Sequence, residues 1–106
     1  MSDCIFCQII EGKIPSTSVY QDDDFIVIND IHPSAPVHML VIPKKHVADF
    51  LDAPSGMVTA LIKLVKKMIQ SKHVVSYRLI NNGGGAAFID HLHIHILGSV
   101  AKDRNL

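Results

Sequence analysis

The pattern of apolar positions predicts one long helix and one short helix. Between residues 55 and 71, apolar side chains recur at spacings of three and four, the period of one helix face. Further apolar positions, among them Val58, Ile62 and Ile69, widen this face beyond a single stripe. A shorter helix is predicted over residues 4–12, with Ile5, Phe6 and Ile9 near one side and Gly12 as a typical stop.

The other apolar runs are short and rich in β-forming residues, which favours strands. We expect strands at residues 19–20, 25–28, 37–42, 74–80 and 89–97, separated by turn residues. Short strands around one main helix predict an α+β fold with a mostly antiparallel sheet. Because the chain has neither an internal repeat nor a linker, we expect residues 1–106 to form a single domain.

Composition mainly excludes classes of protein. Ten Lys and Arg balance ten Asp and Glu, so the formal net charge is zero. That balance argues against a protein that binds nucleic acid or a membrane surface through electrostatics. No apolar run approaches the roughly 18 residues that a membrane span needs, and the N-terminus lacks the pattern of an export signal. We therefore expect a cytoplasmic protein.

Three of the seven histidines alternate with apolar residues near the C-terminus. On a strand, His91, His93 and His95 share one face, while the intervening apolar residues share the other and can pack on the helix. Three interpretations compete: a structural histidine face, a metal site, and nucleophilic catalysis by one imidazole whose neighbours set its tautomer. Separately, Cys4 and Cys7 form a C-x-x-C pair, which in the cytosol indicates metal or redox chemistry more than a disulfide.

A resemblance to a known family decides among these interpretations. The strand His91-Leu92-His93-Ile94-His95-Ile96-Leu97 resembles the alternating signature of the histidine triad (HIT) superfamily. Six further segments resemble its Hint branch in order along the chain: Cys4-Ile5-Phe6-Cys7-Gln8-Ile9-Ile10, Ile14-Pro15, Ile28-Asn29-Asp30-Ile31, Pro36-Val37-His38, Leu40-Val41-Ile42-Pro43-Lys44-Lys45-His46 and Asn81-Asn82-Gly83. The resemblance covers roughly residues 4–98 and implies a five-stranded sheet with one long helix and a short N-terminal helix.

The resemblance also implies an activity, hydrolysis of purine nucleoside 5'-phosphoramidates through a covalent nucleotidyl-histidine. His93 would be the nucleophile, His95 and His38 would flank the phosphate, and His91 would support the site. The residues that would contact the nucleotide are Phe6, Ile9, Ile28, Asn29, Asp30, Ile31, Leu40 and Asn81. Judged without the family, the apolar members of this set favour ordinary core packing, and Asp30 is equally typical of a turn.

Relatives of this branch imply two further properties. A structural zinc ion would be held by Cys4, Cys7, His46 and His91, although the residues alone are equally compatible with two reduced cysteines on the first helix. A homodimer would pair the strand at residues 76–80 across a two-fold axis and pack the long helices together. The wide apolar face of the helix and the need to protect a strand edge agree with a dimer.

One segment departs from the family pattern. Gly85-Ala86-Ala87-Phe88-Ile89-Asp90 is one residue shorter than usual and lacks the polar groups expected near the leaving amine. We therefore expect slower catalysis that favours good leaving groups, unless backbone N–H groups of Gly83–Gly85 compensate. Alternative functions are a nucleotide-binding module with weak catalysis, a dinucleoside polyphosphate hydrolase or nucleotidylyl transferase of the same superfamily, and a metalloenzyme that uses the triad as ligands.

Overall fold

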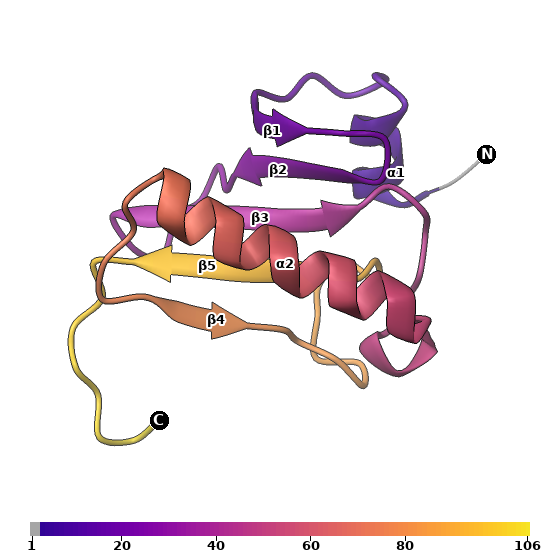
Figure 1. The fold of residues 1–106 in the computed structure, drawn as a ribbon. Helices are drawn as coiled ribbons and strands as arrows, with labels where there is room; N and C mark the ends of the chain where they lie inside the picture. Colours follow the sequence, from indigo (N-terminus) through magenta and orange to yellow (C-terminus); the bar gives the residue numbers. More distant parts are fainter. Residues whose placement is uncertain (1–2) are drawn as a thin grey trace.

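A computed structural model describes residues 3–106, which form a five-stranded sheet with a helix on each face (Figure 1). The strands are β1 (Ser18–Gln21), β2 (Phe25–Asn29), β3 (Val37–Pro43), β4 (Arg78–Ile80) and β5 (Ile94–Gly98). They are arranged in the order β1-β2-β3-β5-β4, and every pairing is antiparallel. The helices are α1 (Ile5–Ile10) and α2 (Ser55–Ser71), with a 3-10 turn at Phe50–Asp52. The predicted α+β class and sheet are confirmed.

Strict alternation along the central strands builds a separate core on each side of the sheet. Val27 of β2, Val41 of β3 and Ile96 of β5 point toward α2 and pack with its buried residues. The intervening residues, such as Ile28 and Leu40, point to the other face and pack under Phe6 of α1. Because successive side chains of a strand face opposite ways, one apolar run can supply both cores. In Figure 1, α2 lies diagonally across its face of the sheet.

Two predicted strands are wrong at their N-terminal ends. The strand expected at residues 74–80 begins only at Arg78, because His73 and Ser76 adopt left-handed φ values of 52° and 49° and turn the chain. The strand expected at 89–97 begins at Ile94. Before it, the His91 N–H donates to the nearby Ile89 carbonyl at 2.9 Å, and the Leu92 N–H donates to Val47 at 2.7 Å. His91 and His93 therefore lie in a segment that leads into β5, and only His95 lies on the strand.

Among residues 3–106, none of the helices has both the length and the apolar character needed to cross a bilayer.

Gly98 at the end of β5 offers a test of the packing. A Cβ atom there would lie 2.7 Å from Val74 Cγ1 and 2.8 Å from Val37 Cβ, so the Gly98→Ala variant is overpacked. We expect it to lower the free energy of unfolding by about 1–3 kcal/mol, measured by urea denaturation. The control is Gly56→Ala in α2, where nothing lies within 4 Å of the added atom and alanine is the better helix former. Equal stabilities for the two variants would contradict this packing.

Candidate active site and metal centre

Four imidazoles gather on the sheet face that also carries α1. His38 lies on β3 and His95 on β5, while His93 and His91 lie on the segment that enters β5. His95 pairs in register with Leu40, a member of the core under α1. His38, His91 and His93 are buried, and His95 is half-buried. Within the part of the chain that the structure describes, every buried side-chain nitrogen and oxygen has a hydrogen-bond partner.

A backbone carbonyl sets the tautomer of His93. Its Nδ1 lies 2.6 Å from the His91 carbonyl oxygen, which can only accept, so Nδ1 carries the proton and Nε2 keeps its lone pair. The Phe6 and His93 rings pack edge to face, with 5.0 Å between their centroids, and this contact restricts the His93 imidazole. The Asn81 side-chain amide donates to the His93 carbonyl oxygen at 3.2 Å and holds the backbone at this position. A neutral imidazole with a lone pair on Nε2 is a competent nucleophile.

A second hydrogen-bond chain leads from the backbone of Ser34 to His95. The Ser34 N–H donates to His38 Nδ1 at 3.0 Å, so neutral His38 carries its proton on Nε2. His38 Nε2 then donates to His95 Nδ1 at 2.8 Å, which leaves the His95 proton on Nε2. Burial, and after it the neighbouring His93 and His38, hold the pKa of His95 below its usual value, which favours its neutral form. His95 thus presents an N–H donor beside the lone pair of His93, with 5.0 Å between their ring centroids.

His91 faces a different group of side chains. Its Nε2 donates to the Pro43 carbonyl oxygen at 2.7 Å, which leaves the Nδ1 lone pair pointing toward Cys4, Cys7 and His46. His91 Nδ1 lies 3.3 Å from Cys4 Sγ, 3.5 Å from Cys7 Sγ and 3.2 Å from His46 Nδ1. Burial, opposed by the Pro43 hydrogen bond, lowers the pKa of His91 and favours the neutral form that binds metals.

These four residues fit a tetrahedral zinc ion. Their ligand atoms all lie within 4.8 Å of one another, and two thiols with two imidazoles are a common structural zinc set. The His91 hydrogen bond to a carbonyl is the kind of outer contact that orients a ligating imidazole. All four predicted ligands therefore come together, from α1 and its N-cap residue Cys4, from the segment after β3 and from the segment before β5.

A second group of possible ligands is less suited to a metal. Asp30, His38 and His95 also place their ligand atoms within 4.8 Å. A metal on His38 Nε2 would push the imidazole proton to Nδ1, where the Ser34 N–H already points. The Ser34 N–H and the His38 Nδ1–H would then face each other, and a buried hydrogen bond would be lost. This group is better suited to holding protons, and the alternative of a metalloenzyme that uses the triad as ligands loses support.

The residues expected to contact the base lie together beside His93. Phe6, Ile28 and Leu40 belong to one buried cluster, and Ile9 packs against it partly exposed. Asp30 follows β2, with Oδ2 3.5 Å from His38 Nε2 and Oδ1 accepting the His32 N–H at 2.8 Å. Asn29 is exposed and so is Ile31, whose exposed fraction is 86%. Asp30, at the end of β2, therefore lies close to the His38 imidazole.

The glycine loop before the triad is tied to a residue that the sequence pattern did not single out. Asp49 Oδ1 accepts the Gly84 N–H at 2.8 Å, and Oδ2 accepts the Leu51 N–H at 3.1 Å. These bonds, with that from Gly84 the strongest, lower the pKa of Asp49. The Gly84 N–H is thus engaged by the protein's own carboxylate and is not available to a substrate anion, contrary to the role considered for it. Ser34 was also missed, because a backbone N–H leaves no signal in a sequence.

The fold and this arrangement of imidazoles define a class of small α+β proteins built around a row of alternating histidines. The chain belongs to one such family, the histidine triad superfamily: a family model described as "Scavenger mRNA decapping enzyme C-term binding" matches residues 3–105. Protein HitA of Neisseria gonorrhoeae is 37% identical over 105 residues, covering 93% of this chain and 98% of that protein. A histidine triad protein from Clostridium difficile has a similar structure, with a TM-score of 0.88, 40% identity and coverage of 98% and 96% of the two chains.

The names of other relatives state an enzymatic activity or a bound metal. An adenosine 5'-monophosphoramidase of Saccharomyces cerevisiae is 33% identical over 96 residues, covering 89% of this chain and 61% of that protein. An adenylylsulfatase of Arabidopsis thaliana is 34% identical over 108 residues, covering 96% and 55%. A zinc-bound histidine triad family protein from Mycobacterium smegmatis matches with a TM-score of 0.83 at 29% identity, covering 96% and 78%. Hydrolases therefore occur among the relatives.

The zinc content of the purified protein tests the metal centre. We expect protein purified without chelator to hold about one zinc ion per chain, and the Cys4→Ser/Cys7→Ser double variant to hold none. Because metal binding stabilises the folded state, the double variant and the chelator-treated protein should both unfold at a lower temperature. Elemental analysis and thermal unfolding measure the two effects. His73→Gln, which changes an exposed histidine outside the cluster, should keep its zinc. A wild-type protein without zinc would contradict the assignment.

Proposed function

We propose that this protein hydrolyses purine nucleoside 5'-phosphoramidates through a nucleotidyl group carried on His93. The observation that carries the proposal is the hydrogen-bond pattern, which leaves a lone pair on His93 Nε2 and an N–H on His95 Nε2, with 5.0 Å between the two ring centroids. A nucleophile next to a hydrogen-bond donor suits attack on a phosphorus atom whose oxygens and leaving group gain charge. The phosphoramidase activity in the name of the yeast relative supports the same reaction.

The reaction would take place in two displacements. His93 Nε2 attacks the α-phosphorus, the P–N bond of the substrate breaks, and its electron pair leaves with the amine. Water then attacks the phosphorus, and the bond to His93 breaks with its electron pair returning to Nε2. The departing nitrogen takes up one proton and the water releases one, so the imidazoles regain their starting state. Splitting one difficult step into two easier ones is the advantage of covalent catalysis.

Each neighbouring residue has a place in this scheme. His95 Nε2 would donate a hydrogen bond to the phosphate or the leaving nitrogen, and His38 would hold the tautomer of His95. Phe6, Ile9, Ile28 and Leu40 would form the apolar wall against the purine, and Asp30 would accept ribose hydroxyl protons, with Asn29 and Ile31 beside it. Asn81 would act through the backbone of His93, to which it donates.

A second candidate is hydrolysis of adenylyl sulfate. The name of the Arabidopsis relative favours it, and the same attack by His93 would release sulfate in place of an amine. Sulfate leaves without taking a proton, so the two reactions place different demands on His95. Comparing kcat/KM for an adenosine 5'-phosphoramidate and for adenylyl sulfate would decide which leaving group the site prefers.

The central test replaces the nucleophile. We expect His93→Ala to abolish turnover of adenosine 5'-phosphoramidate while the protein still folds, because the variant lacks the imidazole that would carry the nucleotidyl group. Intact-protein mass after brief mixing should show one added nucleotidyl group on the wild type and none on the variant. His73→Ala, a change of an exposed histidine after α2, is the matched control. Turnover by His93→Ala within tenfold of wild type, about 1.4 kcal/mol of barrier, would refute the assignment.

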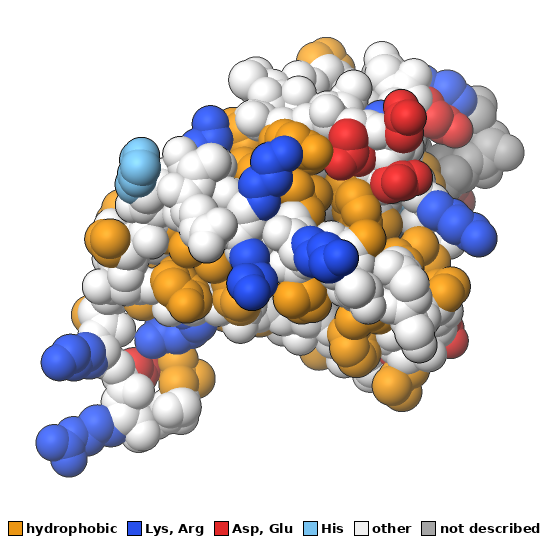
Figure 2. Space-filling model, in the orientation of Figure 1, with side chains coloured by type: hydrophobic (Ala, Val, Ile, Leu, Met, Phe, Trp, Pro, Cys, Tyr) orange, Lys and Arg blue, Asp and Glu red, His pale blue; other side chains and the backbone are white. Residues whose placement is uncertain are grey.

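We also propose that the protein is a homodimer joined along β4. This strand is at the edge of the sheet, and large apolar side chains are exposed on and near it and on α2: Ile62, Val75, Tyr77 and Leu79. Figure 2 shows apolar side chains interspersed with lysines on the face that carries α2. An unprotected edge strand with exposed apolar neighbours is a natural place for a second chain to pair.

Light scattering tests the dimer. We expect a dimer mass at micromolar concentration for the wild type and a monomer mass for Leu79→Asp, which places a charge at the edge of the sheet. Leu51→Asp is the control, since Leu51 has an exposed fraction of 87% but lies in the 3-10 turn, away from β4. A monomeric wild type would refute the proposal.

A further inference from the structure

The row of catalytic imidazoles continues along the sheet to an arginine. Arg78 of β4 pairs in register with Leu97 of β5, and Leu97 pairs with His38 of β3. Because residues in register share a face, the Arg78 side chain leaves the sheet on the side of His38 and His95. Arg78 and His95 are diagonal neighbours across the β4–β5 pair, so their Cβ atoms are roughly 7–8 Å apart. The arginine side chain is long enough to cover this distance.

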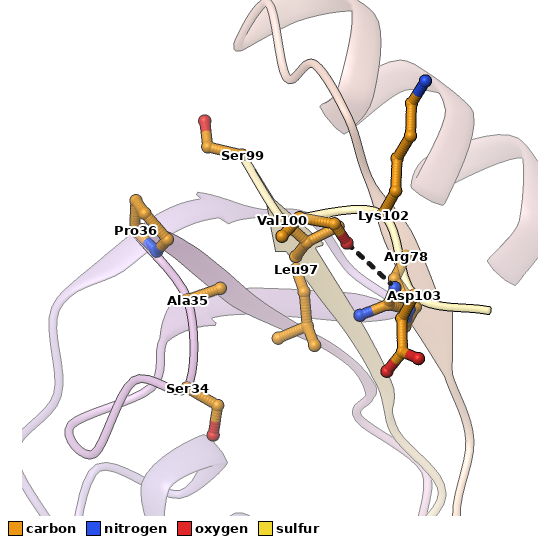
Figure 3. A pocket seen from close by; sticks show the side chains of 10 residues that line it. Ser34, Ala35, Pro36, Arg78, Leu97, Ser99, Val100, Lys102 and Asp103 are labelled. Carbon is orange, nitrogen blue, oxygen red and sulfur yellow. Dashed lines mark hydrogen bonds between the residues drawn. The ribbon is translucent and has the colours of Figure 1, made fainter. Parts of the chain in front are cut away.

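A pocket lies where this row ends (Figure 3). Its volume is about 360 Å³, within the range of roughly 300–1,000 Å³ usual for small-molecule sites. Its lining comes from the loop before β3, from Arg78 and Leu97, and from the C-terminal tail. Ser34, whose N–H starts the chain to His95, is one of the lining residues. The imidazoles do not line the pocket, but Leu97, which does, lies two residues beyond His95 on the same face of β5.

The tail over the pocket is held in place by backbone hydrogen bonds. Ser99 has a left-handed φ of 58°, and its N–H donates to the Val75 carbonyl oxygen at 2.8 Å. The Val100 N–H donates to the Ser76 carbonyl oxygen at 3.0 Å. These bonds fix the direction of the chain as it leaves β5. The pocket wall is thus part of the fold, and it has a defined position relative to Arg78.

Arg78 has hydrogen-bonding capacity to spare. Within residues 3–106, its guanidinium donates one long hydrogen bond of 3.4 Å, from Nη2 to the Ala101 carbonyl oxygen, drawn as a dashed line in Figure 3. A guanidinium has five N–H donors in a planar fork that suits carboxylate and phosphate oxygens. Lys102 extends away from the other lining residues in Figure 3. Asp103 also lines the pocket and adds a negative charge to it, and its Oδ1 accepts the Asn105 N–H at 2.9 Å.

We infer that this pocket is the leaving-group subsite and that Arg78 selects leaving amines that carry an anionic oxygen group, such as a carboxylate. The inference rests on the proposed function and names the side of the phosphate from which the amine departs. With the purine against Phe6 and the phosphorus at His93 and His95, the amine extends along the sheet toward Leu97 and Arg78. There the guanidinium pairs with the anion, and Asp103 limits the preference by its own charge.

The experiment compares two substrates of nearly the same shape. They are the adenosine 5'-phosphoramidates of 4-aminobutanoate and of 4-aminobutanamide, which differ in the charge at the far end of the amine. The measured quantity is the ratio of kcat/KM for the carboxylate over the amide. A charge-assisted pair formed by Arg78 should give a ratio above one in the wild type, and Arg78→Gln should lower it by about tenfold. Asp103→Asn should raise the ratio, because it removes the opposing charge.

Controls separate this inference from general damage. Lys66→Gln removes an exposed cation from α2, on the other face of the sheet, and should leave the ratio as in the wild type. Arg78→Lys keeps the charge without the planar fork and should retain part of the preference. If Arg78→Gln does not fold, the wild-type ratio measured at rising salt takes its place, and it should fall as the charges are screened.

The outcomes distinguish the subsite from the function itself. Turnover of neither substrate by the wild type would refute the proposed function, and the subsite with it. Turnover of both with a ratio that neither Arg78→Gln nor salt changes would refute the subsite alone. An equal loss on both substrates in Arg78→Gln would also refute it, since the effect would then be independent of the charge on the amine.

Discussion

Two hydrogen bonds from imidazole N–H groups to backbone carbonyl oxygens decide what this site can do. One joins His93 to the carbonyl of His91, and the other joins His91 to the carbonyl of Pro43. A carbonyl oxygen can only accept, so each bond fixes which ring nitrogen keeps its lone pair. The lone pair of His93 is on Nε2, beside His95, and that of His91 is on Nδ1, beside the cysteines. Two histidines of one motif are thus prepared for different chemistry.

The same geometry links the metal centre to the active site. His91 supplies a predicted zinc ligand through its ring and the acceptor for His93 through its backbone. Helix α1 contributes to both places, since it carries Cys7 and Phe6, and the Phe6 ring contacts His91 and His93. With only six residues, α1 is too short to be stable by itself, so its place depends on these contacts. An ion at the cysteines would hold both the helix and the base wall against the sheet.

Hydrogen bonds between side chains and backbone groups hold the residues around His93 in place. Ser34 sets the proton position of His38 through its N–H, and Asn81 anchors the carbonyl of His93. Asp49 closes the glycine loop by accepting the Gly84 N–H. None of these contacts involves a group expected to react, yet each fixes a position or a tautomer on which the reacting groups depend. This division between reacting imidazoles and supporting contacts agrees with the need for preorganised donors in catalysis.

The sequence by itself determined the class of fold, both helices and the central strands, because alternation of polar and apolar residues sets which face a side chain occupies. The resemblance to the histidine triad family, built on short local motifs, added the prediction of which histidines and cysteines come together, and the structure brings them together. Only the tertiary structure decided where β4 and β5 begin, since the left-handed residues His73 and Ser76 and the hydrogen bond from Leu92 to Val47 make both strands start later than expected. It also decided the tautomers and brought Arg78 onto the face that carries His38 and His95. Some of these contacts join residues far apart in the chain, with separations of 57 between His38 and His95 and 48 between His91 and Pro43. The short contacts, such as that from His93 to the His91 carbonyl oxygen, depend on the path of the backbone before β5, and no local pattern records either kind.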